Sequence, residues 1–411
     1  MAMIQPFKAL RPQPQLAKQV ASQPYDVLSS TEAKQVAAGN PASFLHVTKS
    51  EIDLPESVDI HDAKVYEQAK ENITAFIKRD VLFRESKDCY YIYQLIMHGR
   101  AQTGLVCVSS VDDYENDIIK KHEFTRPEKE LDRINHIKTS GAQTGNVFLA
   151  YRNNESLDAL IENWKKTKSA VYDFVADDQI QHTIWVVNDT SAIDNITSIF
   201  EKEIPCTYIA DGHHRAASAA KVRAALGANA TKNADYFLTT LFPSNQLYIM
   251  DYNRVVKDLN GLTAEAFIEV VSTKFDIEQL AKEPFTPATL HEFGMYINGC
   301  WYKLTAKPGT YTNDPIGILD VTILQNNILD AILGIADPRT DARIDFVGGI
   351  RGLQVLADRV DNGQFAAAFS LYAVTIDQLF AIADSGNVMP PKSTWFEPKL
   401  RDGLLTHLIY E

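Results

Sequence analysis

The chain is poor in cysteine. Four thiols stand among 411 residues, at Cys89, Cys107, Cys206 and Cys300, and no two of them form a Cys-x-x-Cys pair. The gaps between them are long, and disulfide frameworks belong to oxidising compartments and to denser cysteine patterns. We therefore predict reduced, mostly buried thiols in a cytoplasmic protein, and we consider a disulfide the less favoured interpretation.

Long apolar runs are also missing. A membrane-spanning helix needs about 20 predominantly apolar residues, and no segment approaches that length. The first residues, MAMIQPFKALRPQPQ, are too polar and too rich in proline to resemble a signal peptide. We therefore expect no membrane partner.

Positive charge is in deficit. The chain has 40 Lys and Arg against 53 Asp and Glu, which gives a net charge of −13. Nucleic-acid affinity depends largely on neutralising phosphates with basic side chains, so this balance argues against a nucleic-acid partner. A small anionic ligand stays open, because a local basic pocket can exist in an acidic protein.

The familiar glycine-rich phosphate loops are absent. The chain has no Walker-type or kinase-type glycine loop, and Gly348-Gly349 lacks the Gly-x-Gly-x-x-Gly spacing of a dinucleotide site. Internal repeats and low-complexity tracts are missing too. Phosphate chemistry, if present, therefore has to use another arrangement.

Hydrophobic residues make up 45% of the chain, enough for a sizeable core. Helical periodicity, as in residues 62–79, alternates with strand-like segments, such as the pair around Gly99-Arg100 and a strand ending near Val27. We predict an α+β protein with mixed sheets and packed helices. The length favours two domains, which we place at residues 1–255 and 256–411 and expect to pack together.

One short segment places carboxylate, imidazole and guanidinium side chains together at a predicted helix start. Asp211-Gly212-His213-His214-Arg215 follows a predicted strand and opens an Ala-rich helix. Unpaired N–H groups and the helix dipole at such a position bind phosphate, and an arginine can bind it in bidentate fashion. A histidine there can act as acid, base or nucleophile, and Asp211 can accept a proton or hold Mg²⁺.

Two plainer interpretations compete with this one. Asp211 could simply cap the helix, with both histidines solvated in the first turn. A zinc site is less fitting, because His213 and His214 are sequence neighbours and would point apart on a helix.

A second cluster, KKHEFTRPEKELDR, covers Lys120 to Arg133. Such charge runs usually form solvated helix faces, but this one also carries His, Thr and Pro and does not follow simple i,i+4 pairing. We predict that it lines one pocket with the first motif. Basic side chains would take phosphate charge, and Glu123 or Asp132 would serve as base or metal ligand. The residues concerned are Lys121, His122, Glu123, Thr125, Lys129, Asp132 and Arg133.

Two shorter pieces add candidates. Lys392, Ser393 and Thr394 follow a double proline in a loop that suits an anion, with a surface turn as the equal alternative. We expect the second domain to contribute this loop to the site. Tyr25 and Asp26 stand at a predicted strand end, where site residues and structural turns are both common.

Several blocks of the sequence also resemble a known protein family. Six blocks, in the same order, resemble the domain-of-unknown-function family 1015: RPQPQLAKQVASQPYDVLS, NPASFLHVTKSEIDLP, KKHEFTRPEKELDR, YIADGHHRAASA, DPRTDARIDFVGGIRG and MPPKSTWFEPKLRDGLL. The Asp-Gly-His-His-Arg step is similar, more weakly, to the ParB/sulfiredoxin-like superfamily, whose nucleotide-binding signature places Gly, His and Arg at a helix start. The resemblance implies a ParB/sulfiredoxin-like nucleotide- or phosphate-binding element within a larger fold. It also implies kinship with kinases of free serine. A DNA-partitioning role is disfavoured, because the chain is acidic and shows no convincing helix-turn-helix.

From this we expect a phosphotransferase acting on a small hydroxyl amino acid, most simply a pyrophosphate-dependent kinase of free L-serine or its reverse reaction. Its partners would be pyrophosphate or a nucleotide and a small amino acid, with Mg²⁺ as cofactor at Asp211 and Asp132; a homo-oligomer is compatible with the sequence. A non-catalytic phosphate-binding regulator and a phosphoserine phosphatase are the alternatives. The predicted catalytic residues are Asp211, His213, His214 and Glu123. The predicted phosphate- and substrate-binding residues are Gly212, Arg215, Lys121, His122, Thr125, Lys129, Arg133, Lys392, Ser393 and Thr394.

Overall fold

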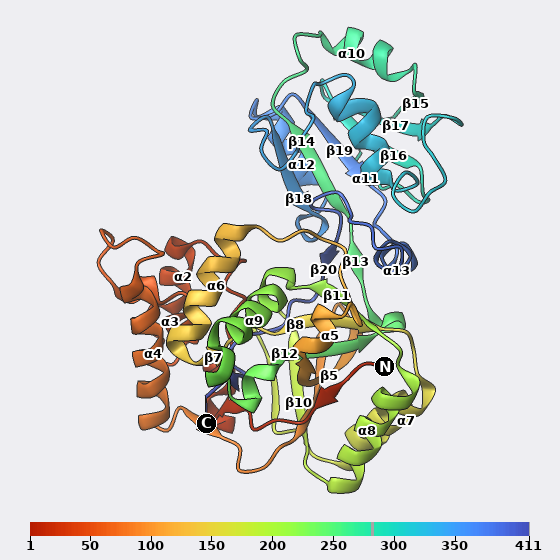
Figure 1. Ribbon diagram of the computed structural model, residues 1–411. Helices are drawn as coiled ribbons and strands as arrows, with labels where there is room; N and C mark the ends of the chain where they lie inside the picture. The colour runs from red at the N-terminus through yellow and green to blue at the C-terminus, as the bar shows by residue number, and fades with distance from the viewer. Residues whose placement is uncertain (281–282, 411) are drawn as a thin grey trace. The chain divides into compact units, whose positions relative to one another are not determined.

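The computed structural model describes residues 1–280 and 283–410 and divides the chain into two compact units (Figure 1). The first unit combines Met1–Leu247 with Pro398–Glu411, and the second is Tyr248–Glu397. The expected boundary at residue 255 lies inside a strand of the second unit, Tyr252–Val256. The last segment of the expected second domain belongs to the first unit.

A mixed sheet forms the centre of the first unit, in the order β6-β11-β8-β12-β5-β4-β10-β9, with β1 also paired to β5. The pairs β11/β6 and β12/β8 are parallel, and the other pairs are antiparallel. The strands are β1 (Ile4–Gln5), β4 (Tyr90–Met97), β5 (Arg100–Ser110), β6 (Ile119–Lys120), β8 (Val147–Tyr151), β9 (Tyr172–Val175), β10 (Gln181–Val187), β11 (Thr207–Asp211) and β12 (Tyr236–Pro243). An α+β class is therefore confirmed.

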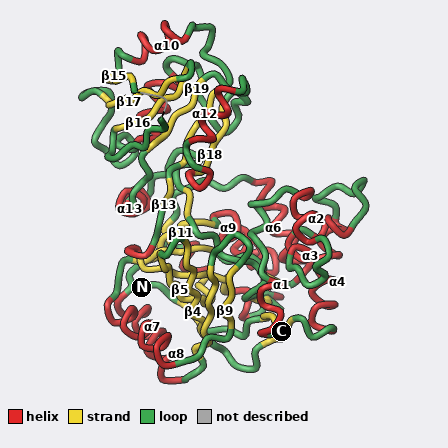
Figure 2. Tube along the Cα trace, turned by 180° about the vertical axis from the view of Figure 1, so that it is seen from behind, coloured by secondary structure: helices red, strands yellow, loops and turns green. Residues whose placement is uncertain are grey.

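One face of this sheet carries a continuous apolar core. Registered partners such as Ile92 and Leu105, or Leu149 and Leu241, put apolar side chains of neighbouring strands on the same side. Helices α7 (Glu155–Thr167), α8 (Thr190–Glu203) and α9 (His213–Leu226) bury apolar side chains in that core. Figure 2 shows α7 and α8 as a pair of neighbouring helices beside the strands.

Helix α9 is rich in alanine because it lies close to the sheet. Ala216, Ala219 and Ala220 are buried in the apolar core, where larger side chains would push the helix away. Its other side packs on helix α6 (Pro127–Ser140), and the Ser218 hydroxyl donates to the Glu130 carbonyl oxygen at 3.2 Å. Figure 1 shows α6 and α9 next to each other.

Smaller elements complete the first unit. Two short ribbons pair β2 (Leu10–Pro12) with β3 (Leu82–Arg84) and β7 (Ala142–Gln143) with β21 (His407–Leu408). The further helices are α1 (Ala17–Val20), α2 (Ser30–Ala37), α3 (Leu45–Thr48), α4 (Ala63–Lys78) and α5 (Val111–Glu115), with single 3-10 turns at Pro14–Leu16, Ser50–Asp53, Gly227–Asn229, Lys232–Asp235 and Ser244–Gln246.

The second unit is built on an antiparallel sheet in the order β15-β17-β16-β19-β14-β18. Its strands are β14 (Tyr252–Val256), β15 (Phe275–Gln279), β16 (Glu292–Ile297), β17 (Cys300–Ala306), β18 (Ile344–Gly348) and β19 (Ala367–Leu371), and β13 (Ile249–Met250) pairs separately with β20 (Trp395–Phe396). Its helices are α10 (Ala264–Val271), α11 (Asp320–Leu324), which continues as a π-helical turn over Gln325–Asp330, α12 (Gln354–Asp361) and α13 (Ile376–Asp384); a 3-10 turn covers Gly349–Arg351.

Several sequence expectations are confirmed. Helix α4 occupies most of the predicted residues 62–79, β4 and β5 form the predicted hairpin, and Pro127 begins α6 after interrupting the charged run. The predicted strand ending near Val27 is wrong, because residues 25–27 form a turn. All four cysteines are free; Cys89 and Cys107 are buried, and the other two are partly exposed. Within the described residues, no helix has the length and apolar character needed to cross a membrane.

Candidate functional site

The step from β11 into α9 depends on glycine. Gly212 has φ of 102°, a conformation that L side chains rarely adopt. A Cβ atom there would come within 3.3 Å of the Val147 Cα and of the Arg215 guanidinium carbon. Gly212 therefore allows a tight entry into α9 directly beside strand β8.

No side chain caps the start of α9. The first N–H groups of a helix have no intrahelical acceptor, and they carry the positive end of the helix dipole. An uncapped start of a 14-residue helix next to an arginine is suited to an anion. The interpretation of Asp211 as a capping residue does not describe this turn.

Arg215 lies at the centre of the site. Its guanidinium donates to the Asn146 carbonyl oxygen and lies 3.4 Å from Asp211 Oδ1 and 3.9 Å from Asp26 Oδ2. Burial lowers the pKa of Arg215, but the surrounding carboxylates outweigh burial and raise it. The side chain remains 11% exposed, so this fixed cation can still meet a ligand.

Asp211 is held between two cations. Its Oδ2 lies 3.0 Å from Lys399 Nζ, and its Oδ1 faces Arg215. Burial raises the pKa of the Asp211 carboxyl, but the Lys399 and Arg215 charges more than compensate and hold that pKa well below its usual range. Asp211 is therefore ionised across the physiological pH range.

The two clusters predicted from the sequence lie together. The His122 N–H donates to His213 Nε2 at 3.4 Å, and the rings of these histidines meet edge to face with centroids 4.5 Å apart. One turn later, the Arg126 N–H donates to His214 Nε2 at 2.9 Å. Backbone groups of the loop before α6 thus close directly over the first turn of α9.

These contacts keep the histidines neutral. Burial lowers the pKa of His122 to about 4, and burial with the neighbouring His122 lowers the pKa of His213 well below its usual value. Burial, reinforced by Lys129, also lowers the pKa of His214. Because Nε2 accepts in His213 and His214, the proton of each ring is on Nδ1, and His213 Nδ1 lies 3.7 Å from Glu123 Oε2.

The other members of the 121–133 cluster include two held by protein contacts and one that is exposed. Lys121 lies 3.7 Å from Asp117 and 4.6 Å from the centroid of the Tyr114 ring, so it is held at α5. Thr125 hydrogen-bonds the Glu130 carboxylate and so stabilises the start of α6. Lys129 is exposed on the first turn of α6.

Buried Arg133 and half-buried Asp132 form an ion pair on α6. Asp132 Oδ2 accepts from two guanidinium nitrogens of Arg133 at 2.8 and 2.6 Å, and its Oδ1 accepts from Tyr66 and His61. Burial raises the pKa of Asp132, but these partners outweigh burial and lower it. The Arg133 guanidinium stacks over the Tyr25 ring at 4.0 Å from its centroid.

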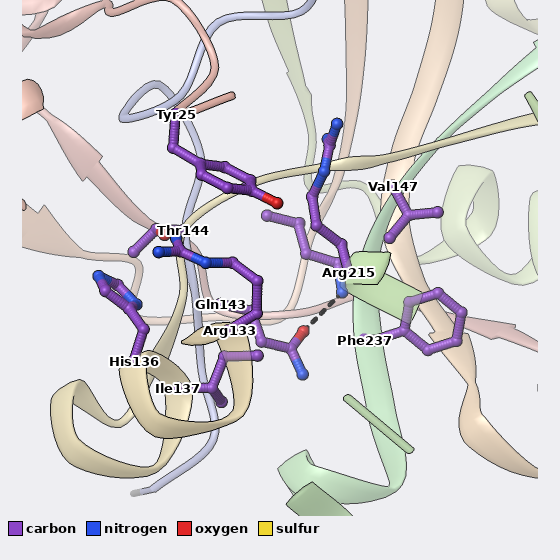
Figure 3. Close-up of a pocket in the computed structure, with 11 residues that line it drawn as sticks. Tyr25, Arg133, His136, Ile137, Gln143, Thr144, Val147, Arg215 and Phe237 are labelled. Atoms are coloured by element: carbon purple, nitrogen blue, oxygen red, sulfur yellow. Dashed lines mark hydrogen bonds between the residues drawn. The ribbon is translucent and has the colours of Figure 1, made fainter. Parts of the chain in front are cut away.

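A pocket opens between these groups. Its volume is about 30 Å³, and Figure 3 shows Tyr25, Arg133 and Arg215 lining it from separate elements. The Gln143 side chain, which accepts from the Leu238 N–H at 2.8 Å, forms part of its wall. The lining residues are Tyr25, Arg133, His136, Ile137, Gln143, Thr144, Gly145, Val147, Arg215, Phe237 and Leu238.

The carboxylates predicted to hold magnesium do not fit that role as they stand. Both oxygens of Asp132 and both oxygens of Asp211 are engaged by protein donors or cations. Among residues 1–280 and 283–410, no group of three or more His, Cys, Asp or Glu side chains could hold a metal ion. Magnesium therefore stays a prediction, and we derive no step through it.

The loop with Lys392, Ser393 and Thr394 belongs to the second unit. Ser393 Oγ donates to the Pro390 carbonyl oxygen at 2.6 Å, and Lys392 Nζ lies 5.7 Å from the centroid of the Tyr252 ring. Arg254 also donates to the Lys392 carbonyl oxygen at 2.9 Å. The contribution of this loop to the phosphate site stays a prediction.

Sequence reasoning missed two residues that stand at the site. Lys399 contacts Asp211, and Asp402 is buried beside Gly145, where a Cβ atom on Gly145 would lie 3.6 Å from Asp402 Oδ1. Burial raises the pKa of Asp402 to about 7, and its Oδ2 has no hydrogen-bond partner. Neither residue is close in sequence to the helix start, so no local spacing could indicate them.

Comparison with known proteins gives a family and a set of distant folds. The family model described as "Protein of unknown function (DUF1015)" matches residues 4–322. No curated protein matches the chain.

Among solved structures, a mutant free serine kinase in complex with AMP covers 73% of this chain and 92% of its own, at 12% identity and a TM-score of 0.37. A conserved hypothetical protein from Pyrococcus furiosus covers 74% and 94%, at 13% identity and a TM-score of 0.33. C-terminally truncated SbnI from Staphylococcus aureus covers 72% and 85%, at 11% identity and a TM-score of 0.36. Likenesses at these scores carry no argument about chemistry, which has to come from the site.

Proposed function

Since the chain belongs to the DUF1015 family of proteins of unknown function, a membership that assigns no reaction, we propose from its site that it is a phosphotransferase. Its acceptor would be a small hydroxyl amino acid, with free L-serine as the first candidate. Its donor would be pyrophosphate, because the chain has no loop of the kind that cradles a nucleotide triphosphate.

The observation that carries this proposal is the meeting of α9 and α6 at one pocket. Arg215 of α9 and Arg133 of α6 both line it. Two guanidinium groups would supply the charge neutralisation and positioning on which phosphoryl transfer depends, and Arg215 stands in the uncapped first turn of α9. The pocket is small, about 30 Å³, so it suits a small ligand group rather than a macromolecule.

The proposed reaction is a single displacement at phosphorus. The acceptor hydroxyl oxygen forms a bond to one phosphorus of pyrophosphate, the bridging P–O bond breaks, and orthophosphate leaves with the electron pair. The hydroxyl proton passes to the leaving phosphate, because the low pKa of the Asp211 carboxyl makes that carboxylate a weak base; Asp211, held ionised, would orient the acceptor hydroxyl. Arg215 would hold the phosphoryl oxygens while this occurs.

The histidines have supporting roles in this scheme. His213 is only 4% exposed and neutral, so it holds the loop before α6 on the start of α9 rather than contacting the donor. His214 does the same for Arg126, and its Nδ1–H can donate to an anion. Glu123, 45% exposed, orients His213.

Phosphorus NMR tests the proposal directly. Incubation with L-serine and pyrophosphate should produce phosphoserine and orthophosphate in equal amounts, and phosphoserine with orthophosphate should show the reverse reaction. ATP in place of pyrophosphate tests the alternative donor. Hydrolysis of phosphoserine without transfer would instead support a phosphatase.

Arg215→Ala is the matched variant for this assay. Losing a fixed cation from the developing charge should lower transfer by about 100-fold or more. Thermal unfolding of the variant checks that the protein remains folded, because Arg215 also bonds the Asn146 carbonyl oxygen. Turnover at the wild-type rate in a folded Arg215→Ala protein would contradict the assignment.

A further inference from the structure

The chain returns to the first unit after completing the second. Pro398–Glu411 belongs to the first unit, although it lies beyond residues 4–322, which the family model matches. Nothing in the comparisons assigns a role to this C-terminal segment.

The C-terminal segment is fixed in place by backbone pairing and burial. Asp402 exchanges two backbone hydrogen bonds with Ser22, at 3.1 and 2.9 Å, and Thr406 exchanges two with Leu10, at 2.9 Å each. Leu404, Leu405 and Ile409 are each 1% exposed. The segment is therefore fixed to the first unit from Asp402 onward, three residues after Lys399.

Lys399 stands at that start and reaches the phosphate site. Its Nζ lies 3.0 Å from Asp211 Oδ2, while Arg215 faces the other oxygen of the same carboxylate. The two cations thus flank one carboxylate at the mouth of α9. Lys399 is 22% exposed and Asp211 is 30% exposed, so both can meet a ligand from solvent.

Lys121 and Lys129, the lysines predicted from the 121–133 cluster, have other surroundings. Lys121 is held at α5 by Asp117 and Tyr114, and Lys129 is exposed on the first turn of α6. A lysine ammonium carries three N–H donors around one compact charge, so it is able to bridge a carboxylate and a phosphoryl oxygen. Lysine is a common phosphate ligand and acts there as a point charge.

We propose that Lys399 is a phosphoryl-binding residue of this site, contacting the oxygens of the phosphate donor together with Arg215. This inference rests on the proposed function and adds a residue from the C-terminal segment to it. Lys399 would bridge Asp211 and the donor, so that the Asp211 carboxylate and the phosphoryl group are held side by side.

Isothermal titration with inorganic pyrophosphate tests the inference on the full-length protein. Lys399→Met should weaken binding by about 10- to 100-fold, the loss expected for a charged hydrogen bond. Lys399→Arg should bind within about threefold of the wild type, because the cation is kept. Lys34→Met is the matched control: Lys34 also pairs with a carboxylate, Glu56, at 3.1 Å, and that variant should bind normally.

A double variant separates direct contact from charge balance. If Lys399 acted only by neutralising Asp211, Asp211→Asn combined with Lys399→Met would restore binding to the wild-type level. Direct contact predicts that the double variant stays at least about tenfold weak. Restored binding in the double variant would overturn the inference.

The role of Lys399 and the proposed function can be disproved separately. Wild-type affinity in a folded Lys399→Met protein, with binding lost in Arg215→Ala, overturns the role of Lys399 and leaves the proposed function standing. If the wild type binds no pyrophosphate, or if Arg215→Ala binds it normally, the proposed function fails and the inference fails with it.

Discussion

Charge balance around Arg215 determines what the site can hold. Arg215 and Lys399 face the carboxylates of Asp211 and Asp26, and burial favours the neutral form of Asp402 by raising its pKa to about 7. A fully ionised set of three carboxylates would repel a phosphate. The buried, partly protonated Asp402 leaves the two cations able to attract one.

The residues of this cluster differ in how far the sequence could predict them. Asp211 to Arg215 could be named because strand, glycine and helix follow one another locally. Lys399 could not, because it meets Asp211 across 188 residues and only the folded chain brings them together. The internal pairing of Asp132 was equally hidden, since its partners Tyr66 and His61 come from another part of the chain.

At the scale of the element, the start of α9 depends on the backbone conformation of Gly212. Gly212→Ala would place a Cβ within 3.3 Å of the Val147 backbone at a φ that alanine rarely adopts. We expect the start of α9 to shift, with pyrophosphate binding weakened by about tenfold or more and stability lowered by about 1–3 kcal/mol. Calorimetric titration and denaturant unfolding measure the two effects.

Gly227→Ala is the control, because Gly227 ends the same helix and also has positive φ, but a Cβ atom there would have no other atom within 4 Å. That variant should lose some stability and bind normally. Equal binding by the two variants would contradict the role given to the start of α9.

Elements with strong local signals were the predictable part of the fold. The β4/β5 hairpin turns at His98 and Gly99, both at positive φ, and α6 begins at a proline. The segment at Tyr25 is a turn rather than the predicted strand, because its conformation depends on a distant contact: the Tyr25 ring packs under Arg133 of α6. The local alternation of polar and apolar residues gives no information about such a distant contact.

At the scale of the whole molecule, the sequence indicated two domains but not that the first is discontinuous. The chain enters the second unit at Tyr248 and leaves it at Glu397. What returns Pro398–Glu411 to the first unit is a set of backbone pairings with Leu10, Ser22 and Gly141, all far away in the sequence. No composition shift marks that return.

The two units should respond to pH in opposite directions. In the first unit, burial lowers the pKa of six histidines, so the folded state binds fewer protons than the unfolded state below pH 6.5. Its stability should therefore fall as pH falls from 6.5 toward 4, offset partly by Asp402, whose pKa is raised. The histidines are His122, His136 and His407, with pKa values of about 4, His182, with a pKa of about 3, and His213 and His214, whose pKa values are also lowered.

The second unit contains Asp320, which is 3% exposed and whose pKa burial raises to about 7. That contribution is fully present below the unfolded pKa near 4 and is lost as pH rises through 7. Calorimetric scans at pH 5.5 and 7.5 should show one transition moving down and the other moving up on acidification. Asp320→Asn should flatten the second, and Asp330→Asn, at an exposed site, should not. Transitions that move together would contradict this account.

The central claim is that phosphoryl oxygens bind at the start of α9. A crystal structure of the full-length protein grown with pyrophosphate tests it most directly. The account predicts the anion within hydrogen-bond distance of the Arg215 guanidinium and of the first N–H groups of α9. Pyrophosphate bound elsewhere on the molecule, with Arg215 making only its contacts to Asn146, Asp211 and Asp26, would contradict it.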